Sequence, residues 1–455
     1  MAVYTPHGES VVQTIFGKSR VSYEGYASPP AGTLARVDEF LTCSDWSRGV
    51  ARVKCTACEY SYFRPFSCKT FHLCPSCDQK RTILYAEYLA EELLLELPHR
   101  QFVFTVPKIL RPYFKNDKRL FGEVSKLIFE LLSGFFSLAA QRELLCGCVS
   151  SYQSFGEFAR FHPHWHVLVL EGGFDEWGRF VYLPLSCDAG LLKLWQEAIL
   201  VLFLKQKLIE QDRATMIRSW VHSGFSVESE TRMLDKSTKE ALGQYAVRGP
   251  VSEQRISYDW KADVVTWSAR ANGFFDGKVE TFKGFEFVDQ LVTHLPPRRA
   301  QLIRRYGIYS SRVRSKWVDM PKITRFAPEG WTKTHEAELE LAQDSPESAE
   351  LPDVPDSWAR LRKKNWARLL KKVYEVDPFL CPNCGGAMVV VGVIEDPVKL
   401  KGSSTGRLHN NRHYPRYVDR RFPKLELPFP VVPATFQLVS SATLARAMPR
   451  APRAI

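Results

Sequence analysis

Three histidines occupy alternate positions in the segment 162–169, which reads His-Pro-His-Trp-His-Val-Leu-Val. On a β-strand, residues two apart point to the same face, so His164 and His166 would project side by side. Two neutral imidazoles on a rigid surface form half of a site for a divalent metal ion. The apolar run that follows and the Glu171-Gly-Gly turn favour a core strand, and the competing interpretation is a His-rich loop.

A second candidate for chemistry is the segment 294–315, where Tyr306 and Tyr309 lie among six arginines. A phenol beside guanidinium groups can attack a phosphodiester, because the positive field favours the phenolate and neutralises charge on the phosphorus centre. The alternative is a basic DNA-contacting element whose tyrosines pack or stack on bases.

Cysteines form two Cys-x2-Cys pairs, Cys55 with Cys58 and Cys74 with Cys77. Four thiolates at tetrahedral reach are the ligands of a structural Zn²⁺, and the paired spacing predicts one such site. Three further residues could complete a second site or replace one ligand, namely Cys43, Cys68 and His72.

A third pair, Cys381 with Cys384, lies near the C-terminus and needs two more ligands. His409 and His413 could supply them in a Cys2His2 set, and the alternative is that these cysteines cap a tight turn.

The composition points to a polyanionic partner. The chain of 455 residues carries a formal charge of +12 with a pI near 9.1, which favours nucleic acid. No signal peptide and no long uncharged apolar stretch is found, so we expect a cytoplasmic protein with no membrane partner. The 11 cysteines are an odd number, which in a reducing compartment indicates metal ligands or core thiols.

The histidine segment should form a hairpin with the strand before it. Periodicity predicts strands at Cys148–Ser154, His164–Leu170 and Gln101–Val106, and short strands across 245–290. It predicts helices at 82–97, Leu120–Ala140 and Leu191–Leu208.

Composition shifts divide the chain. Glu336–Asp356 holds eight acids and no Lys or Arg, which is typical of a disordered linker. The predicted organisation is a flexible arm (1–35), a zinc-binding domain (36–98), a core (99–330), an acidic linker (331–356), a small C-terminal module with a possible zinc knuckle (357–420) and a disordered tail (421–455).

The ordered set of cysteine pairs, histidine segment and basic tyrosine segment resembles the rolling-circle insertion-sequence transposases, the HUH-type or two-tyrosine family. Further family-like stretches are Gln101–Pro107, His222–Phe225 and Arg304–Arg312. The resemblance implies an α+β fold, with an N-terminal zinc-knuckle module and a nuclease core whose central antiparallel sheet is flanked by helices.

The resemblance also implies that His164 and His166 hold Mg²⁺ or Mn²⁺. Gln153 is the expected third ligand, because a hairpin would bring it opposite His164, and the alternatives are Glu157, a harder donor, or His162, which Pro163 separates from the strand.

The tyrosine pattern departs from the family. The family motif is Tyr-Tyr-Gly-x-Tyr, and Arg305 stands at its first position here, so the chain looks like the single-tyrosine, common-region branch. The resemblance then implies that Tyr309 is the nucleophile, with Tyr306 as second choice, and that flanking phosphates are held by Arg304, Arg305, Arg312 and Arg314.

The expected activity is metal-dependent nicking and strand transfer of single-stranded DNA at element ends, through a 5′-phosphotyrosine intermediate, by a nucleoid-associated bacterial protein. Three alternative functions would explain part of these sequence features. They are a replication initiator or relaxase of the same chemistry, a non-catalytic zinc-dependent DNA-binding protein, and a metal hydrolase that uses the histidine pair to activate water.

Overall fold

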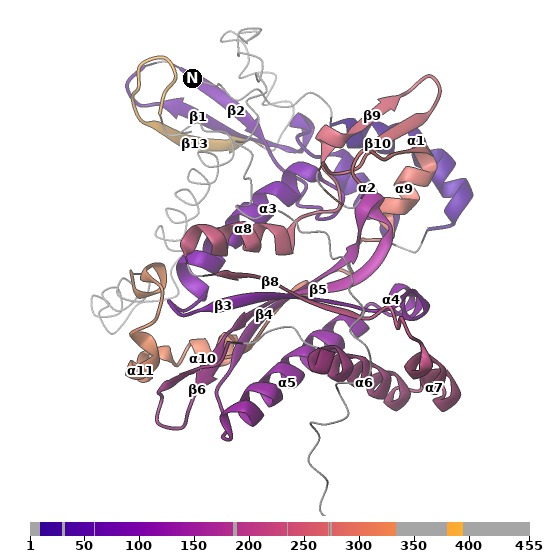
Figure 1. Ribbon diagram of the computed structural model, residues 1–455. Helices are drawn as coiled ribbons and strands as arrows, with labels where there is room; N and C mark the ends of the chain where they lie inside the picture. The colour runs from indigo at the N-terminus through magenta and orange to yellow at the C-terminus, as the bar shows by residue number, and fades with distance from the viewer. Residues whose placement is uncertain are drawn as a thin grey trace, which may run out of the picture.

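A five-stranded antiparallel sheet forms the centre of the computed structural model (Figure 1). The structure describes residues 10–29, 32–58, 60–184, 189–233, 235–271, 273, 275–333 and 380–394. The strand order is β12-β4-β5-β3-β8. Their bounds are β3 His99–Thr105, β4 Gly147–Phe155, β5 Phe161–Leu170, β8 Ser226–Met233 and β12 Ile303–Gly307. The predicted α+β class with an antiparallel central sheet is confirmed.

The alternation of side chains along β5 sets the two faces of this sheet. Trp165, Val167 and Val169 point into the largest apolar core, where the Trp165 indole donates to the carbonyl of Phe121 at 3.1 Å. Leu168 and Leu170 point to the opposite side and pack in a separate core. Because side chains two apart share a face, the histidines lie on this second side.

Helices cover both faces of the sheet, as Figure 1 shows. One face is covered by α5 (Leu120–Ala140) and α6 (Ala189–Lys205), with α4 (Arg111–Asn116) and α7 (Gln211–Ser219) beside them. The other, which carries the histidines, is covered by α3 (Pro75–Tyr88) and α8 (Lys236–Val247). The predicted helices at 120–140 and 191–208 are therefore confirmed, whereas α8 includes Tyr245, where short strands were expected.

The predicted flexible arm, residues 1–35, is wrong for its described part, because residues 11–41 carry two packed helices. These are α1 (Val11–Ala27) and α2 (Thr33–Leu41), which pack with α9 (Gly284–Val292) and a small sheet into a second core. That sheet consists of β9 (Ile256–Asp259), β10 (Val264–Ser268) and β11 (Val279–Lys283). The burial of Val12, Ile15 and Phe16 explains the order of this segment.

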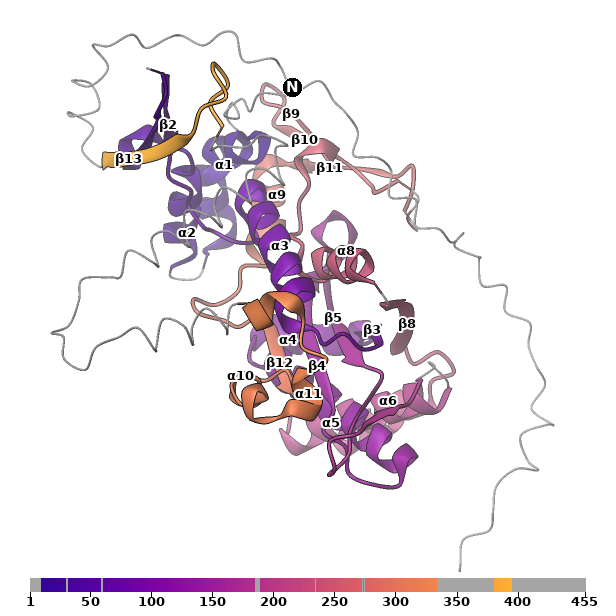
Figure 2. The same ribbon diagram turned by 90° about the vertical axis from the view of Figure 1, so that its left-hand side faces the viewer.

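The C-terminal cysteine pair does not belong to a separate module. β13 (Met388–Ile394) joins β1 (Val50–Cys55) and β2 (Ser61–Pro65) in a three-stranded sheet at one end of the molecule (Figures 1 and 2). The remaining short elements are β6 (Gly172–Phe174), β7 (Phe180–Tyr182), α10 (Ser311–Arg314) and α11 (Pro321–Thr324). The acidic stretch beyond residue 333, His409, His413 and the predicted tail lie outside the described residues.

In the described part of the chain, every helix is too short or too polar to cross a membrane.

Gly307 ends β12 with a backbone that other residues disfavour. Its φ is +58°, and a Cβ atom there would lie 1.9 Å from the carbonyl oxygen of Cys146. We expect Gly307→Ala to lower the free energy of unfolding by at least about 1 kcal/mol, measured by denaturant unfolding at saturating zinc. The matched control is Gly25→Ala in α1, where a Cβ meets nothing within 4 Å and helix propensity should add about 0.5–1 kcal/mol. Equal effects of the two substitutions would contradict this account.

Candidate active site

His164 and His166 lie side by side on β5, as the sequence predicted. Their ring centroids are 4.9 Å apart, and His162 continues the row at 5.2 Å from His164. His166 is 1 % exposed and His164 is 8 % exposed. Burial is the main cause that lowers the pKa of His164 to about 4 and the pKa of His166 well below its ordinary value. Both imidazoles are therefore neutral at physiological pH, which is the form that binds metals.

The hydrogen bond of His164 fixes which nitrogen is available. Its Nδ1 lies 2.8 Å from the carbonyl oxygen of His162, which can only accept a hydrogen bond. Nδ1 therefore carries the proton, and the lone pair is on Nε2. This arrangement, a protonated nitrogen held by a backbone carbonyl, is common among histidines that bind metals through the other nitrogen.

Gln153 stands opposite His164 in the β4–β5 pairing. Its amide nitrogen donates to the carbonyl oxygens of Tyr245 and Ala246, each at 3.1 Å, at the C-terminal end of α8. Its Oε1 is buried and has no hydrogen-bond partner among the described residues. The hairpin thus brings a carbonyl-type oxygen beside the histidines.

A second glutamine, Gln101 on β3, completes the surroundings of His166. Its side-chain nitrogen lies 3.0 Å from Nδ1 of His166, while its own Oε1 and Nε2 of His166 are buried and have no hydrogen-bond partner in the described part of the chain. The two amide orientations of glutamine fill nearly the same space. With the amide turned, Nδ1–H of His166 donates to Oε1, and Nε2 keeps a lone pair for a metal ion.

The donor set fits a divalent cation. Within the described part of the chain, Nε2 of His166 and Oε1 of Gln153 are buried without a hydrogen-bond partner, and a buried polar atom in that state costs free energy unless something binds it. Imidazole nitrogens together with an amide oxygen can bind Mn²⁺ or Mg²⁺. His164, His166 and Gln153 are therefore the residues that would hold the ion.

Tyr245 is the tyrosine that the fold brings to this pair. Its ring contacts His166 edge to face, with the centroids 5.0 Å apart. It projects from the last turn of α8, and that turn is fixed to β4 by Gln153 and by Ser151, whose hydroxyl donates to the carbonyl of Ala246 at 2.8 Å. The phenol is thus positioned by the same strand that carries the glutamine.

Guanidinium groups surround the phenol and the histidines. Arg248 lies 4.5 Å and Arg270 lies 6.0 Å from the centroid of the Tyr245 ring. Arg111, at the start of α4, is near enough to His164 to contribute to its lowered pKa. Nε of Arg248 and Nε of Arg111 are buried and have no hydrogen-bond partner among the residues that the structure describes. Unpartnered guanidinium donors on two sides of a site are suited to binding the oxygens of a phosphate.

Tyr309 is not at this site, which contradicts its assignment as nucleophile. It is fully buried in the core beneath α3, and burial raises its pKa. Its hydroxyl donates to Nε2 of His99 at 2.5 Å. His99 pairs with Leu170, whereas Thr105 pairs with His164. At about 3.3 Å per residue, the two positions are about 20 Å apart along the strand.

Tyr306 is also excluded as nucleophile by its position. It faces the opposite side of the sheet, where its ring stacks on Phe129 of α5 at 5.3 Å, and burial raises its pKa to about 12.

The arginines of the predicted DNA-binding set are spread over both sides of the sheet edge. Arg304 packs against Gly122 of α5. Arg305 donates to the hydroxyls of Tyr88 and Ser311, and Arg314 donates to the carbonyl of Glu92. Arg312 is exposed on α10. They do not surround the histidines.

The two alternative third metal ligands, Glu157 and His162, lie in different surroundings in the structure. Glu157 is bound in an ion pair with Arg255 and lies in the turn that connects β4 to β5. His162 remains in the row of rings, and burial lowers its pKa to about 4. Gln153 is the better third ligand because the strand register places it directly opposite His164.

The cysteines form two clusters rather than the predicted set of Cys55, Cys58, Cys74 and Cys77. One cluster contains Cys43, Cys68, Cys74 and Cys77, and the other contains Cys55, Cys58, Cys381 and Cys384. His72 belongs to neither, because its Nδ1 donates to the carbonyl of His294 at 3.0 Å. In the first cluster Sγ of Cys68 lies 3.7 Å from Sγ of Cys77, and Sγ of Cys43 lies 3.6 Å from Sγ of Cys74. This geometry fits a structural zinc ion.

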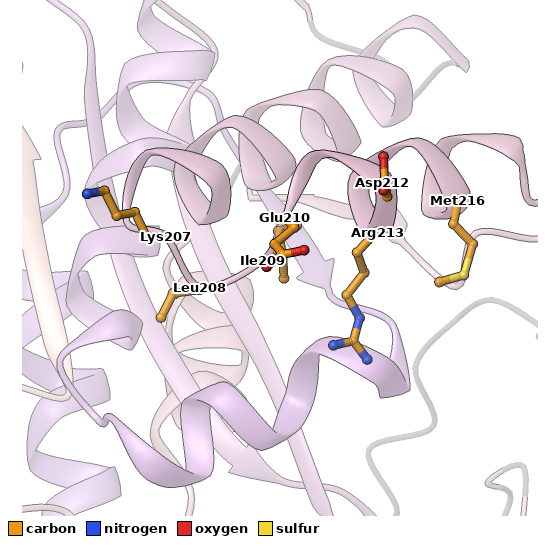
Figure 3. Close-up of a pocket in the computed structure, with 7 residues that line it drawn as sticks. All are labelled: Lys207, Leu208, Ile209, Glu210, Asp212, Arg213 and Met216. Atoms are coloured by element: carbon orange, nitrogen blue, oxygen red, sulfur yellow. The ribbon is translucent and has the colours of Figure 1, made fainter.

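A wider hollow lies away from the histidines. It is formed by the α6–α7 turn, where Lys207, Glu210 and Arg213 line a mixed-charge surface (Figure 3). A narrower cleft borders the site itself, between α3, α8, β4 and β12, and is lined by Arg81, Gln153 and Arg248 among others.

Sequence reasoning missed Tyr245, Gln101, Arg248 and Arg270. A search for tyrosines among dense arginines selects 304–314, whereas the two guanidiniums at Tyr245 come from separate segments. Two signals were available. The family-like stretch that starts at Gln101 points to that residue. The helix start at Asp235, whose side chain accepts a hydrogen bond from the backbone N–H of Thr238, points to the helix that carries Tyr245.

Known proteins match most of this chain. Residues 15–106 match a model described as a transposase zinc-binding domain, and residues 147–316 match one described as a putative transposase. The chain is 25 % identical over 379 residues to the transposase for insertion sequence element IS801 of Pseudomonas savastanoi pv. phaseolicola, covering 79 % of this chain and 83 % of that protein. No solved structure matches the chain. The histidines, Gln153 and Tyr245 fall within 147–316.

The contact between Tyr309 and His99 is expected to be structural. Nδ1 of His99 lies 2.7 Å from the carbonyl of Leu97 and donates to it, so Nε2 of His99 accepts a hydrogen bond from the Tyr309 hydroxyl. Tyr309→Phe leaves that buried acceptor unpaired, and we expect the free energy of unfolding to fall by about 1–3 kcal/mol in denaturant unfolding. Tyr182→Phe, at an exposed position, is the control and should change it little. An unchanged stability of the Tyr309 variant would contradict this role.

Gln101 is expected to act on metal affinity through His166. Gln101→Leu removes the group that holds Nδ1–H, and loss of such a partner weakens metal binding about 10–100-fold. The measurement is calorimetric titration of the full chain with Mn²⁺, beside thermal unfolding. Gln290→Ala is the matched control. Gln290 lies on α9, at a distance from His166, and its side chain donates a hydrogen bond to the carbonyl of Phe158. Unchanged Mn²⁺ affinity of the Gln101 variant would reject this role.

Proposed function

This chain belongs to the family of rolling-circle insertion-sequence transposases with an N-terminal zinc-binding domain, and we propose that it nicks and transfers single-stranded DNA with Tyr245 as the nucleophile. A transposase binds DNA and breaks and joins its strands. The finer proposal concerns which residues do so, and by what intermediate. The observation that carries it is the contact of the Tyr245 ring with His166, in a group of buried metal-binding donors.

The proposed reaction is a phosphoryl transfer to a phenol. The Tyr245 oxygen attacks the scissile phosphorus, a P–O bond to Tyr245 forms, and the P–O3′ bond breaks. The 3′ oxygen leaves with a proton as a free hydroxyl, and the 5′ end stays linked as a phosphotyrosine. That hydroxyl, or another, can later attack the phosphotyrosine, and the bond energy is conserved without ATP.

A Mg²⁺ or Mn²⁺ ion bound by His164, His166 and Gln153 would supply Lewis-acid polarisation of the phosphate. The protein supplies orientation and charge. β4 and β5 hold the three donors, and the last turn of α8 holds the phenol beside them. Arg248 and Arg270 stand where they can neutralise charge as the phenolate forms and as the phosphorus centre becomes five-coordinate.

Single-stranded DNA at element ends is the proposed substrate. A basic chain gains affinity for the phosphate backbone, and the cleft beside Gln153 carries Arg81 and Arg248. The zinc-binding domain lies on the same side, because α3 begins at the cysteines and ends over the central sheet (Figure 2). Binding by this domain would position the strand at Tyr245.

Covalent adduct formation tests the proposal. Purified protein is mixed with fluorescent single-stranded oligonucleotides that tile the element ends, with Mn²⁺ or with EDTA, and resolved on denaturing gels. We expect a shifted protein–DNA band that requires Mn²⁺, is lost in Tyr245→Phe, and falls at least about 100-fold in His164→Ala, because electrostatic stabilisation of that kind is worth this much.

Tyr309→Phe and Tyr306→Phe are the controls, and both should form the adduct when folded. An adduct that persists in Tyr245→Phe would reject Tyr245 as nucleophile. Tight binding by the unmodified protein without an adduct on any oligonucleotide would favour the non-catalytic DNA-binding function instead.

A further inference from the structure

The second cysteine cluster joins segments from opposite ends of the chain. Cys55 ends β1 and Cys58 follows it, while Cys381 and Cys384 lie in a turn before β13. Cys58 and Cys381 are 323 positions apart in the sequence. Neither matched family model reaches residue 381, since they end at 106 and 316.

The sulfur positions are those of a tetrahedral metal site. Sγ of Cys55 lies 3.6 Å from Sγ of Cys384, and Sγ of Cys58 lies 3.6 Å from Sγ of Cys381. Four sulfurs at 2.3 Å from a tetrahedral zinc ion are about 3.8 Å from one another. A disulfide would need about 2.05 Å, so the distances match metal ligands rather than paired cysteines.

Backbone N–H groups point at the sulfurs in both halves of the cluster. The N–H groups of Ala57 and Cys58 donate to Sγ of Cys55 at 3.3 and 3.4 Å, and the N–H of Gly386 donates to Sγ of Cys384 at 3.4 Å. Such donors stabilise the thiolate form that binds zinc.

β13 packs on a small apolar core and pairs with β1 at six positions. The buried members of that core are Val53, Cys55, Cys381 and Met388, and Tyr60, Tyr62 and Val390 pack against them. Val389, Val391 and Val393 are 41–56 % exposed on the strand itself. A small core contributes little to stability, whereas a structural zinc ion supplies folding free energy directly.

We propose that the second cysteine cluster is a second structural zinc site, and that its zinc ion is what docks residues 380–394 on β1. Each of the four thiols loses its proton on binding. The ion closes the three-stranded sheet at the end where Cys55 pairs with Met388 in the β1–β13 register. The zinc-binding part of this protein therefore contains two ions, one of them shared between the two ends of the chain.

The zinc content of the full-length protein tests the site. We expect two zinc ions per chain by mass spectrometry of metals, and one in the double variant Cys381→Ser/Cys384→Ser. The variant Cys55→Ser/Cys58→Ser should also retain one. The control Cys146→Ala, at a buried thiol outside both clusters, should keep two. One zinc ion in the unmodified protein, or two in either double variant, would overturn the proposal.

Hydrogen exchange tests the docking. Both double variants should lose protection of the amides that β1 and β13 share, while the amides of β3 stay protected, because the central sheet does not depend on this ion. The same loss from substitutions at opposite ends of the chain identifies a shared ion. Protected β1–β13 amides in both variants would show that the strand docks without zinc and would overturn that part. Retention of one zinc ion and of the native circular dichroism shows that the variants are folded.

Discussion

The pairing of β4 with β5 is the constraint on which the candidate site depends. The register sets Gln153 opposite His164 and Ser151 opposite His166. Gln153 and Ser151 then bind carbonyl oxygens in the last turn of α8, which have no partners within the helix. That anchoring sets Tyr245 against His166. A shift of one residue in the register would send the histidines into the apolar core on the other face.

Burial gives the site its electrostatic character. The central strand is covered on both faces, so its histidines are desolvated and stay neutral, with the pKa of His164 lowered to about 4. In the same low-dielectric surroundings, Nε2 of His166 and Oε1 of Gln153 have no hydrogen-bond partner among the described residues. A cation at these atoms satisfies both, and it adds positive charge beside Arg248 and Arg111, which favours an anionic ligand. A metal-loaded site of this kind attracts phosphate more strongly than either group alone.

Local sequence patterns predicted the helices and strands, whereas the tertiary fold determines which residues are in contact. The alternation at 164–170 and the helical spacing at 120–140 are properties of short segments, so both were predicted correctly. Val12, Ile15 and Phe16 are buried at helical spacing, but the Gly and Ser residues in the same segment made this pattern hard to recognise in the sequence. Cys55 and Cys58 could not be paired with Cys381 and Cys384 by spacing, because the register of β1 with β13 brings them together. Arg248 is close to Tyr245 in the sequence, whereas Arg270 is brought to the Tyr245 ring by the fold.

Among the described residues, Tyr245 is the phenol at the site, and this restricts how strands can be exchanged. Ala241 lies one helical turn before Tyr245 on α8, so no second phenol stands four residues away on that face. Tyr152 on β4 points to the other side of the sheet, where it stacks on Phe121 at 4.4 Å. In the proposed reaction, each chain therefore holds one covalent DNA end at a time. A second cleavage must wait until a 3′ hydroxyl has resolved the first phosphotyrosine, or must be made by a second copy of the protein.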